Sequence, residues 1–334
     1  MFCVGSMNRN SRKHEENNKT MIAIKSRNRC GSCAARPAPD RNVQVEWAQI
    51  NDRQVVVATE DRMWVHELDQ NGEQDPFAEP MDGPGSLATT RQLLEAAWCA
   101  GFPGADSNRV APRKSLPRYV WELIGFYHST SNTPQTLTEA AARFREADRS
   151  DLDTFARRFA RLEAGDEKMA VADLEALGYQ AEALIRCCPP PPSTVASVDR
   201  YRSLARGPEP IEVFGYCYAL ERASLALNRE DLRAYEHLMP PGVNAISCRW
   251  HHSGVGGDVA HMRAFVRLCS RLPAQDRARI ARSVYDAVVF VTRAPAEAEP
   301  DDAALETLFS TCRRQLAKPG FGAAQPMAAL VQAH

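Results

Sequence analysis

From Arg118 onward, almost every stretch of the chain repeats apolar residues at helical spacing, and this pattern restricts the possible folds more than any other feature. Breaker sequences separate the stretches, namely CCPPPP at 187–192, RGPEP at 206–210 and MPPG at 239–242. The predicted helices cover residues 117–129, 134–147, 151–166, 168–186, 194–206, 210–227, 229–239, 258–272, 274–294 and 301–316. Amphipathic helices in such close succession bury their apolar faces against one another, so we expect a mainly α chain folded as a helical bundle.

The region before these helices has the pattern of a small sheet. Alternating and β-branched runs at Val43–Ile50, Gln54–Ala58 and Met63–Leu68 are separated by Asn-Asp and Glu-Asp turns, which predicts a three-stranded meander. A Gly-Pro-Gly break and an amphipathic helix at about 87–100 complete a small N-terminal α+β domain. The expected order is a disordered tail, this domain, a linker, the bundle and a loosely attached tail, at 1–42, 43–105, 106–117, 118–318 and 319–334.

The composition excludes several classes of protein. A net charge of −1 leaves no basic excess for binding nucleic acid. The chain has neither an apolar run long enough to span a membrane nor a signal-peptide pattern, so we expect a cytoplasmic protein. The ten cysteines lie mostly in apolar, helical contexts that suit reduced thiols, and the Cys30–Cys33 pair lacks the second pair that a zinc ribbon needs.

Two carboxylates interrupt the apolar stripe of the helix predicted at 151–166. Asp166 continues the stripe, and Glu163 lies one turn earlier on the same side of the helix. Carboxylates that face a core are costly unless they are paired or bind a cation. Their partner is either an arginine, such as Arg158 or Arg161, or a metal ion.

A third carboxylate has the same character. Glu221 shares one helix face with Phe214, Cys217 and Tyr218, so it too points toward apolar and aromatic neighbours. Its partner is Arg222, an arginine elsewhere in the chain, or a metal ion.

The segment WHHSGVGGDVAHM, Trp250–Met262, gathers three histidines and an aspartate around a glycine-rich turn. Asp258 is well placed to cap the helix that follows, and His261 lies on the apolar side of that helix. His251 and His252 precede the turn. The segment is therefore either a capped helix with a core histidine or a source of metal ligands.

The combination of these segments favours metal binding over isolated core polar groups. Helix bundles build carboxylate-bridged di-iron sites from glutamates on facing helices together with carboxylate–histidine pairs three residues apart. Nitrogen and oxygen ligands without thiolate suit iron or manganese.

Four segments together resemble the haem-oxygenase-like iron-containing redox enzymes, a family of di-iron oxidases and oxygenases. These segments are YVWELIGFYHSTSNTPQTL, LEAGDEKMAVADLEALGY, GYCYALER and PPGVNAISCRWHHSGVGGDVAHM, and the resemblance covers about 115–295. It implies a haem-oxygenase-like helical bundle.

The resemblance also implies a set of metal ligands, in which Glu221 would be the bridging carboxylate. Asp166 stands where the family usually has histidine, so the implied site is richer in carboxylates. Whether such a site binds two irons, one iron or none is left open by this departure. Two positions have alternatives, His251 for the loop histidine and Glu122 for the ligand on the first helix. The implied ligands are His128, Glu163, Asp166, Glu221, His252, Asp258 and His261.

As a member of such a family, the chain would be an O₂-dependent non-haem iron oxidase or oxygenase of natural-product biosynthesis. It would bind one or two Fe²⁺ per chain, use O₂ as cosubstrate and act on a small-molecule, amino-acid or peptide-derived substrate. These bundles commonly pair, so a homodimer is also expected.

The N-terminal domain is similar to the small PqqD-like peptide chaperones through its meander and the segment FAEPMDGPGSLATTRQLL. This similarity implies capture of a peptide by strand addition at a sheet edge. The alternative is a domain that only caps the bundle.

Two alternatives to an iron enzyme stay open at this point. One is a metal-free scaffold or binding protein with the same bundle, which the Asp166 departure favours. The other is a thiaminase-type hydrolase, in which Cys217 would be the nucleophile with Glu221 one turn away.

Overall fold

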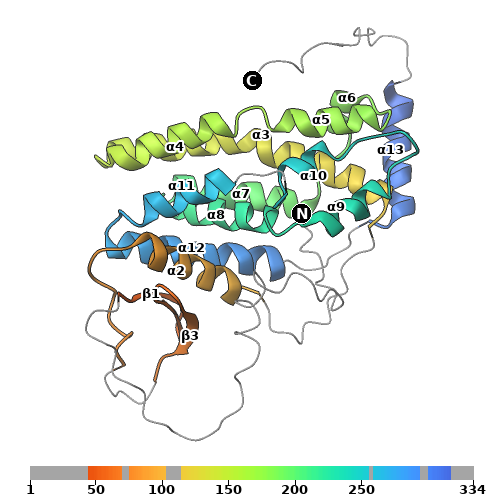
Figure 1. Cartoon of the computed structure of the whole chain (residues 1–334). Coiled ribbons are helices and arrows are strands. Elements are labelled where there is room, and N and C mark those ends of the chain that lie inside the picture. The colour runs from red at the N-terminus through yellow and green to blue at the C-terminus, as the bar shows by residue number, and fades with distance from the viewer. Residues whose placement is uncertain (1–43, 70–74, 103–113, 256–258, 294–299, 317–334) are drawn as a thin grey trace, which may run out of the picture.

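The structure is a computed structural model of the chain, shown in Figure 1. It describes residues 44–69, 75–102, 114–255, 259–293 and 300–316. The predicted tails and most of the predicted linker lie outside these residues, although α3 already begins at Leu116.

The N-terminal part is the predicted meander followed by one helix. Strands β1 (Glu46–Asn51), β2 (Gln54–Ala58) and β3 (Met63–Glu67) form an antiparallel sheet in the order β1-β2-β3, and α2 spans Leu87–Ala100. The mixed α+β character expected for this part is confirmed. At the β3 edge the side chain of Trp64 is 38% exposed, and the predicted capture of a peptide at this edge stays a prediction.

The rest of the described chain is helical, so the mainly α class with a small sheet is confirmed. The helices are α3 (Leu116–Glu146), α4 (Ser150–Leu162), α5 (Glu167–Ala176), α6 (Ala181–Cys187), α7 (Pro192–Arg206), α8 (Glu212–Ser224), α9 (Arg229–Glu236), α10 (Ser247–His251), α11 (Val259–Cys269), α12 (Ala274–Arg293) and α13 (Asp302–Leu316). None of the described helices is both long enough and apolar enough to cross a membrane.

Helix α3 is one continuous helix, although the sequence predicted a break at 130–133 before Pro134. The break was wrong because α3 packs along α4 and α7, and this packing outweighs the one backbone hydrogen bond that Pro134 removes. The hydroxyls of Thr130, Thr133 and Thr136 each donate to the carbonyl oxygen four residues earlier, at 2.9, 3.2 and 2.9 Å. None of these three bonds reaches the carbonyl of Thr130, which would otherwise accept from residue 134.

The helix predicted at 151–166 ends earlier, at Leu162. Gly165 adopts the left-handed backbone conformation, with φ of 105°, and turns the chain into α5. Glu163 and Asp166 therefore lie in a tight connection between two helices rather than on one continuous helix face.

The helix predicted at 168–186 is also divided, into α5 and α6, because Gly178 has a φ of 83°. A second difference lies between the predicted helices at 229–239 and 258–272. The short helix α10 forms there, in a stretch predicted to be a loop.

The sheet and the bundle share one hydrophobic core. Figure 1 shows α2 and α12 between the sheet and the layer that contains α8, with α3 and α4 beyond that layer. Ile50 and Val56 of the sheet belong to the same buried cluster as Phe144 and Phe214 of the bundle.

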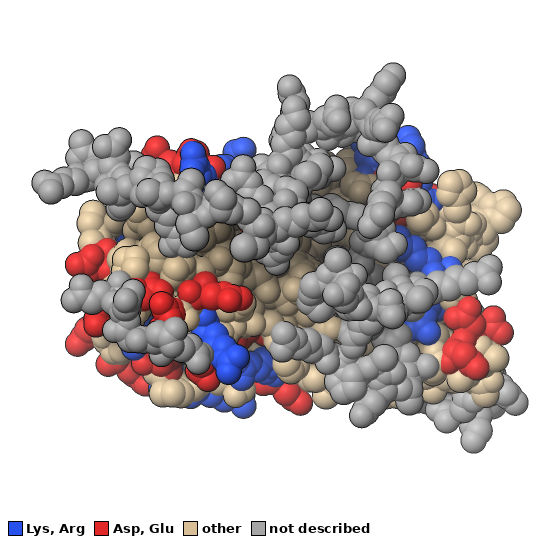
Figure 2. All heavy atoms as spheres, turned by 90° about the horizontal axis from the view of Figure 1, so that it is seen from below, with Lys and Arg blue, Asp and Glu red and all other residues tan. Residues whose placement is uncertain are grey.

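On the face seen in Figure 2, groups of acidic and basic side chains alternate among uncharged ones.

Candidate metal centre

Three of the predicted ligands meet in the bundle and form what we call the carboxylate cluster: Glu163 after α4, Glu221 of α8 and His261 of α11. One donor atom from each lies within 4.8 Å of the other two. His261 Nδ1 is 3.4 Å from Glu163 Oε1 and 4.0 Å from Glu221 Oε1. The three side chains are between 8% and 13% exposed, so their charges lie largely outside bulk water.

Aromatic packing holds His261 in place. Its ring lies 5.1 Å from the ring of Phe159 on α4, and Phe159 in turn lies 4.7 Å from Phe265, one turn after His261 on α11. Phe265 is fully buried. The apolar stripe of α11 therefore aims the imidazole at Glu163, which follows directly after α4.

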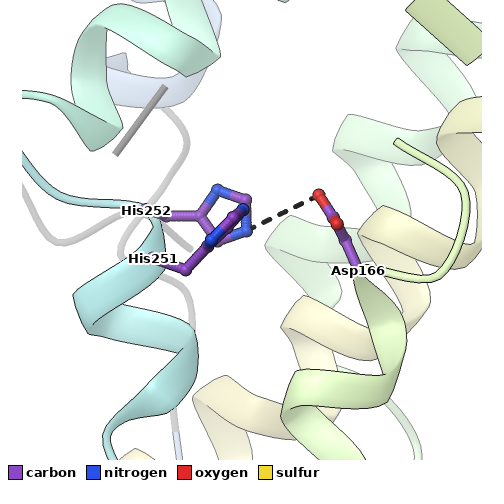
Figure 3. A group of neighbouring side chains, drawn as sticks. All are labelled: Asp166, His251 and His252. Carbon is purple, nitrogen blue, oxygen red and sulfur yellow. Dashed lines mark ion pairs between the residues drawn. The ribbon is translucent and has the colours of Figure 1, made fainter. Parts of the chain in front are cut away.

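The second group, the histidine cluster, consists of Asp166, His251 and His252, whose donor atoms also lie within 4.8 Å of one another. Figure 3 shows the Asp166 carboxylate pointing across a gap at the two imidazoles, which stand at the end of α10. His252 Nε2 lies 3.9 Å from Asp166 Oδ2. Both histidines of the pair belong to this cluster, whereas the sequence left open which of them would be a ligand.

His252 is held as a neutral imidazole. Its side chain is 10% exposed, and Nε2 has no hydrogen-bond partner among the residues that the structure describes. Burial, followed by the neighbouring charges of His251, Arg249 and His261, lowers the pKa of His252 to about 3. A neutral imidazole with an unused ring nitrogen is the form that binds a metal ion.

The two clusters open onto the same small cavity, because Glu163, Glu221 and His252 all line it. Its volume is about 50 Å³. This space suits one or two ions or water molecules, at about 30 Å³ for each water, and is far below the roughly 300 Å³ of a small-molecule pocket. Hydroxyl groups of Ser129 and Thr133 on α3 line the cavity as well.

Two of the predicted ligands are not placed in either cluster. His128 of α3 interacts with the backbone of Ile185 in α6, and burial lowers the pKa of its imidazole. Its rival Glu122 forms an ion pair with Arg249 of α10. Asp258 lies outside the described residues, so its predicted roles as helix cap and ligand stay predictions.

The structure also bears on two alternatives drawn from the sequence. Arg222, the possible partner of Glu221, forms an ion pair with Glu95 of α2 at 2.8 Å. The Cys217 thiol lies 2.7 Å from the Tyr201 hydroxyl, and burial raises the pKa of Cys217 well above its usual range. A thiol kept protonated in this way is a poor nucleophile, which disfavours the thiaminase-type alternative.

Sequence reasoning missed two charged residues beside the histidine cluster. Asp173 of α5 is 1% exposed and accepts hydrogen bonds from the first backbone N–H groups of α10. Arg249 is 8% exposed and lies two residues before His251. A signal existed for Asp173, since it interrupts the apolar run of MAVADLEAL, but none identified its partner.

Comparison with known proteins gives one match. No family model matches the chain, and no curated protein is similar to it. The chain is similar to the crystal structure of a domain of unknown function with a heme oxygenase-like fold from Shewanella denitrificans OS217. The match has 14% identity and a TM-score of 0.40, and it covers 72% of this chain and 92% of that chain.

Proposed function

We propose that the chain is a non-haem iron enzyme that binds one iron ion in each of the two clusters and acts as an O₂-dependent oxidase or oxygenase. One observation carries the proposal. Six nitrogen and oxygen donors from the α4–α5 connection, α8, α10 and α11 form two groups of three, and residues of both groups line one small cavity. One of the donors is a buried imidazole nitrogen without a hydrogen-bond partner among the described residues.

The chemistry of the donors fits iron. The histidine cluster supplies two imidazoles and one carboxylate, the combination that non-haem Fe(II) oxygenases use with further positions open. The carboxylate cluster supplies two carboxylates and one imidazole, as in the carboxylate-rich di-iron proteins built on helix bundles. Burial raises the pKa of the Cys217 thiol, and the thiol forms a hydrogen bond with the Tyr201 hydroxyl. Both features make Cys217 unsuited as a thiolate ligand.

Asp166 supports binding at the histidine cluster rather than its loss. This residue stands where the resemblance predicted histidine, yet its carboxylate faces two imidazoles instead of one. His251 and His252 together supply the nitrogen donors, so the cluster keeps three ligands.

Bound iron supplies oxidation chemistry with O₂ as the oxidant. The protein's own residues define where that chemistry happens. Phe126 and Phe159 line the cavity beside the ligands and exclude water from one side. Ser129, Thr133 and Tyr201 line it too, so a water molecule or O₂ beside the ions would meet polar residues on this side of the cavity.

Metal content tests the proposal. The protein is loaded anaerobically with Fe(II), iron per chain is counted by plasma mass spectrometry, and oxygen uptake is followed after air is admitted. We expect two irons in the wild type, and loss of at least one iron in Glu221→Ala and in His261→Ala. The control is Glu139→Ala, which removes a partly exposed carboxylate of α3 that pairs with Arg206, and it should retain both irons. A wild-type protein without bound iron would contradict the proposal.

A further inference from the structure

The histidine cluster depends on a helix that cannot support itself. Helix α10 has five residues, with His251 at its end and His252 immediately after it. One turn of helix in isolation is unstable in water, because nucleation costs more than its few hydrogen bonds return. Contacts from other elements must therefore fix the direction of both imidazoles.

Asp173 of α5 holds the beginning of α10. Its carboxylate accepts hydrogen bonds from the backbone N–H groups of Ser247 at 3.0 Å and Cys248 at 2.9 Å. The Tyr119 hydroxyl lies 3.4 Å from the same carboxylate and donates to the carbonyl oxygen of Ala245 at 2.7 Å. This buried acid thus caps the helix from a distant part of the chain, in the way that a local N-cap residue does elsewhere.

Glu122 of α3 holds the middle of α10 through Arg249. The two side chains form an ion pair, and each residue is 8% exposed. The hydroxyl of Tyr235 donates to Glu122 Oε2 at 3.4 Å, and the Arg249 guanidinium lies 4.9 Å from the centre of the Tyr235 ring. A planar guanidinium held on two sides permits little rotation of the helix that carries it.

The chain after the two histidines is fixed as well. The backbone N–H of Gly254 donates to the carbonyl oxygen of Leu227 at 3.0 Å, and the ring of Phe126 lies 4.8 Å from the His252 ring. In contrast, the carboxylate cluster is carried by the end of α4, where Glu163 follows the last helical residue, and by α8 and α11, and neither Asp173 nor Glu122 belongs to these helices.

We propose that Glu122 and Asp173 are positioning residues for the histidine cluster, which set its affinity for a metal ion through α10 without touching the ion. The inference rests on the proposed function, because it requires that the two clusters bind metal. Groups that orient metal-binding histidines change metal affinity by about 10- to 100-fold when they are removed. The loss should be confined to one of the two sites, since the carboxylate cluster has separate supports.

Site-resolved iron binding tests this inference. Wild type, Glu122→Gln and Asp173→Ala are equilibrated anaerobically with buffered ⁵⁷Fe(II) over a range of free concentrations, and iron per chain and the Mössbauer spectrum are recorded. Both variants should keep one iron at wild-type affinity and bind the second about 10- to 100-fold more weakly. Asp173→Asn retains only one of the two oxygens that accept from Ser247 and Cys248 and places an amide donor against the other N–H group, so it should recover only part of that affinity.

A matched control separates positioning from general stability. Glu46→Gln disrupts another buried carboxylate–arginine pair, Glu46 with Arg277, far from α10 on β1 and α12. It should lower the melting temperature of the metal-free protein and leave both iron affinities unchanged. If Glu122→Gln does not fold, Tyr235→Phe replaces it, because this change removes only the hydroxyl that contacts Glu122.

The outcomes are distinct. If the folded variants bind both irons more weakly by the same factor, or bind both as tightly as the wild type, the positioning role is overturned and the proposed function stays intact. A wild-type protein that binds no iron would overturn the proposed function and, with it, this inference.

Discussion

At the scale of single residues, burial decides which side chains can bind a metal ion. The environment of His252 suppresses its positive charge, because its pKa is lowered from 6.5 to about 3 mainly by burial. The same environment raises the pKa of the Cys217 thiol and keeps its proton in place. The same cavity therefore contains a neutral imidazole, which can donate a lone pair to a metal ion, and a protonated thiol, which binds metal ions poorly.

The lowered pKa of His252 predicts how stability depends on pH in the metal-free protein. The unfolded state takes up a proton below pH 6.5 and the folded state only near pH 3, so acid favours unfolding between these values. This residue contributes a slope of at most about 1.4 kcal/mol per pH unit in that window and none above it. Urea unfolding of chelator-treated protein at pH 7, 6 and 5 should show a shallower loss of stability for His252→Gln.

Protein with the exposed substitution Glu230→Gln, on α9, serves as the control and should follow the wild type. If the free energy of unfolding falls equally with pH in the wild type and in His252→Gln, then His252 is protonated in the folded protein near its ordinary pKa.

The sequence indicated most of these residues but not all of their roles. Glu163, Glu221 and His261 were expected at a common site because each faces apolar neighbours in a helical pattern, and the structure brings them together. His128 was expected there only from the family resemblance, which does not fix how this chain's first helix is turned. Its rotation toward Ile185 is set by tertiary packing, which no local pattern encodes.

At the scale of elements, close approach of helices fixes the position of α8. Gly215 lies against α12, and a Cβ added to it would be 2.4 Å from the carbonyl oxygen of Ile280 and 2.6 Å from the Cβ of Ser283. The Ser283 hydroxyl donates to the carbonyl oxygen of Glu212 at 2.6 Å across the same contact. Glycine is needed here for space, not for an unusual backbone angle.

Gly215→Ala should therefore destabilise the protein, because one methyl group must push α8 away from the backbone of α12. Overpacking of this kind costs about 1–3 kcal/mol, which urea denaturation measures directly. Ser131→Ala, on an exposed face of α3, should change stability by less than about 0.5 kcal/mol. If the two variants have the same urea midpoint of unfolding, α8 and α12 move apart at little cost in free energy.

Element boundaries were harder to predict than the elements themselves. Helix α3 continues past Pro134 because it packs along α4 and α7, and such tertiary contacts cannot be read from the local sequence. The five-residue α10 has no periodicity of its own, and it exists because Asp173 and Glu122 reach it from other helices. Both differences concern the site, since α3 lines the cavity and α10 carries the histidine pair.

At the scale of the whole molecule, the sheet and the bundle are joined by a buried charge pair. Arg277 of α12 and Glu46 of β1 lie 3.0 Å apart, each 1% exposed. Thr90 of α2 donates to the same carboxylate at 3.2 Å. Together with the shared apolar core, this contact makes separate folding of the two parts unfavourable.

Removal of the arginine should accordingly destabilise the whole molecule. Arg277→Met leaves a buried carboxylate without its cation, at a cost of about 3–5 kcal/mol. Hydrogen exchange measured over a range of urea concentrations should show peptides from β1 and from α8 losing protection at the same urea concentration, which is lower than in the wild type. Arg282→Met breaks an exposed pair with Asp286 and should leave that concentration nearly unchanged. Independent transitions for sheet and bundle would show two separately stable units.

The depth of the two clusters has a consequence for time rather than for affinity. Five of the six donor side chains are only between 8% and 15% exposed to solvent. An iron ion bound there as proposed should therefore leave mainly when the surrounding helices open locally, and its residence time should depend on the rate of that opening as well as on the strength of its bonds. Brief exposure to a chelator should then remove little iron, and warming, which favours local opening, should speed its release.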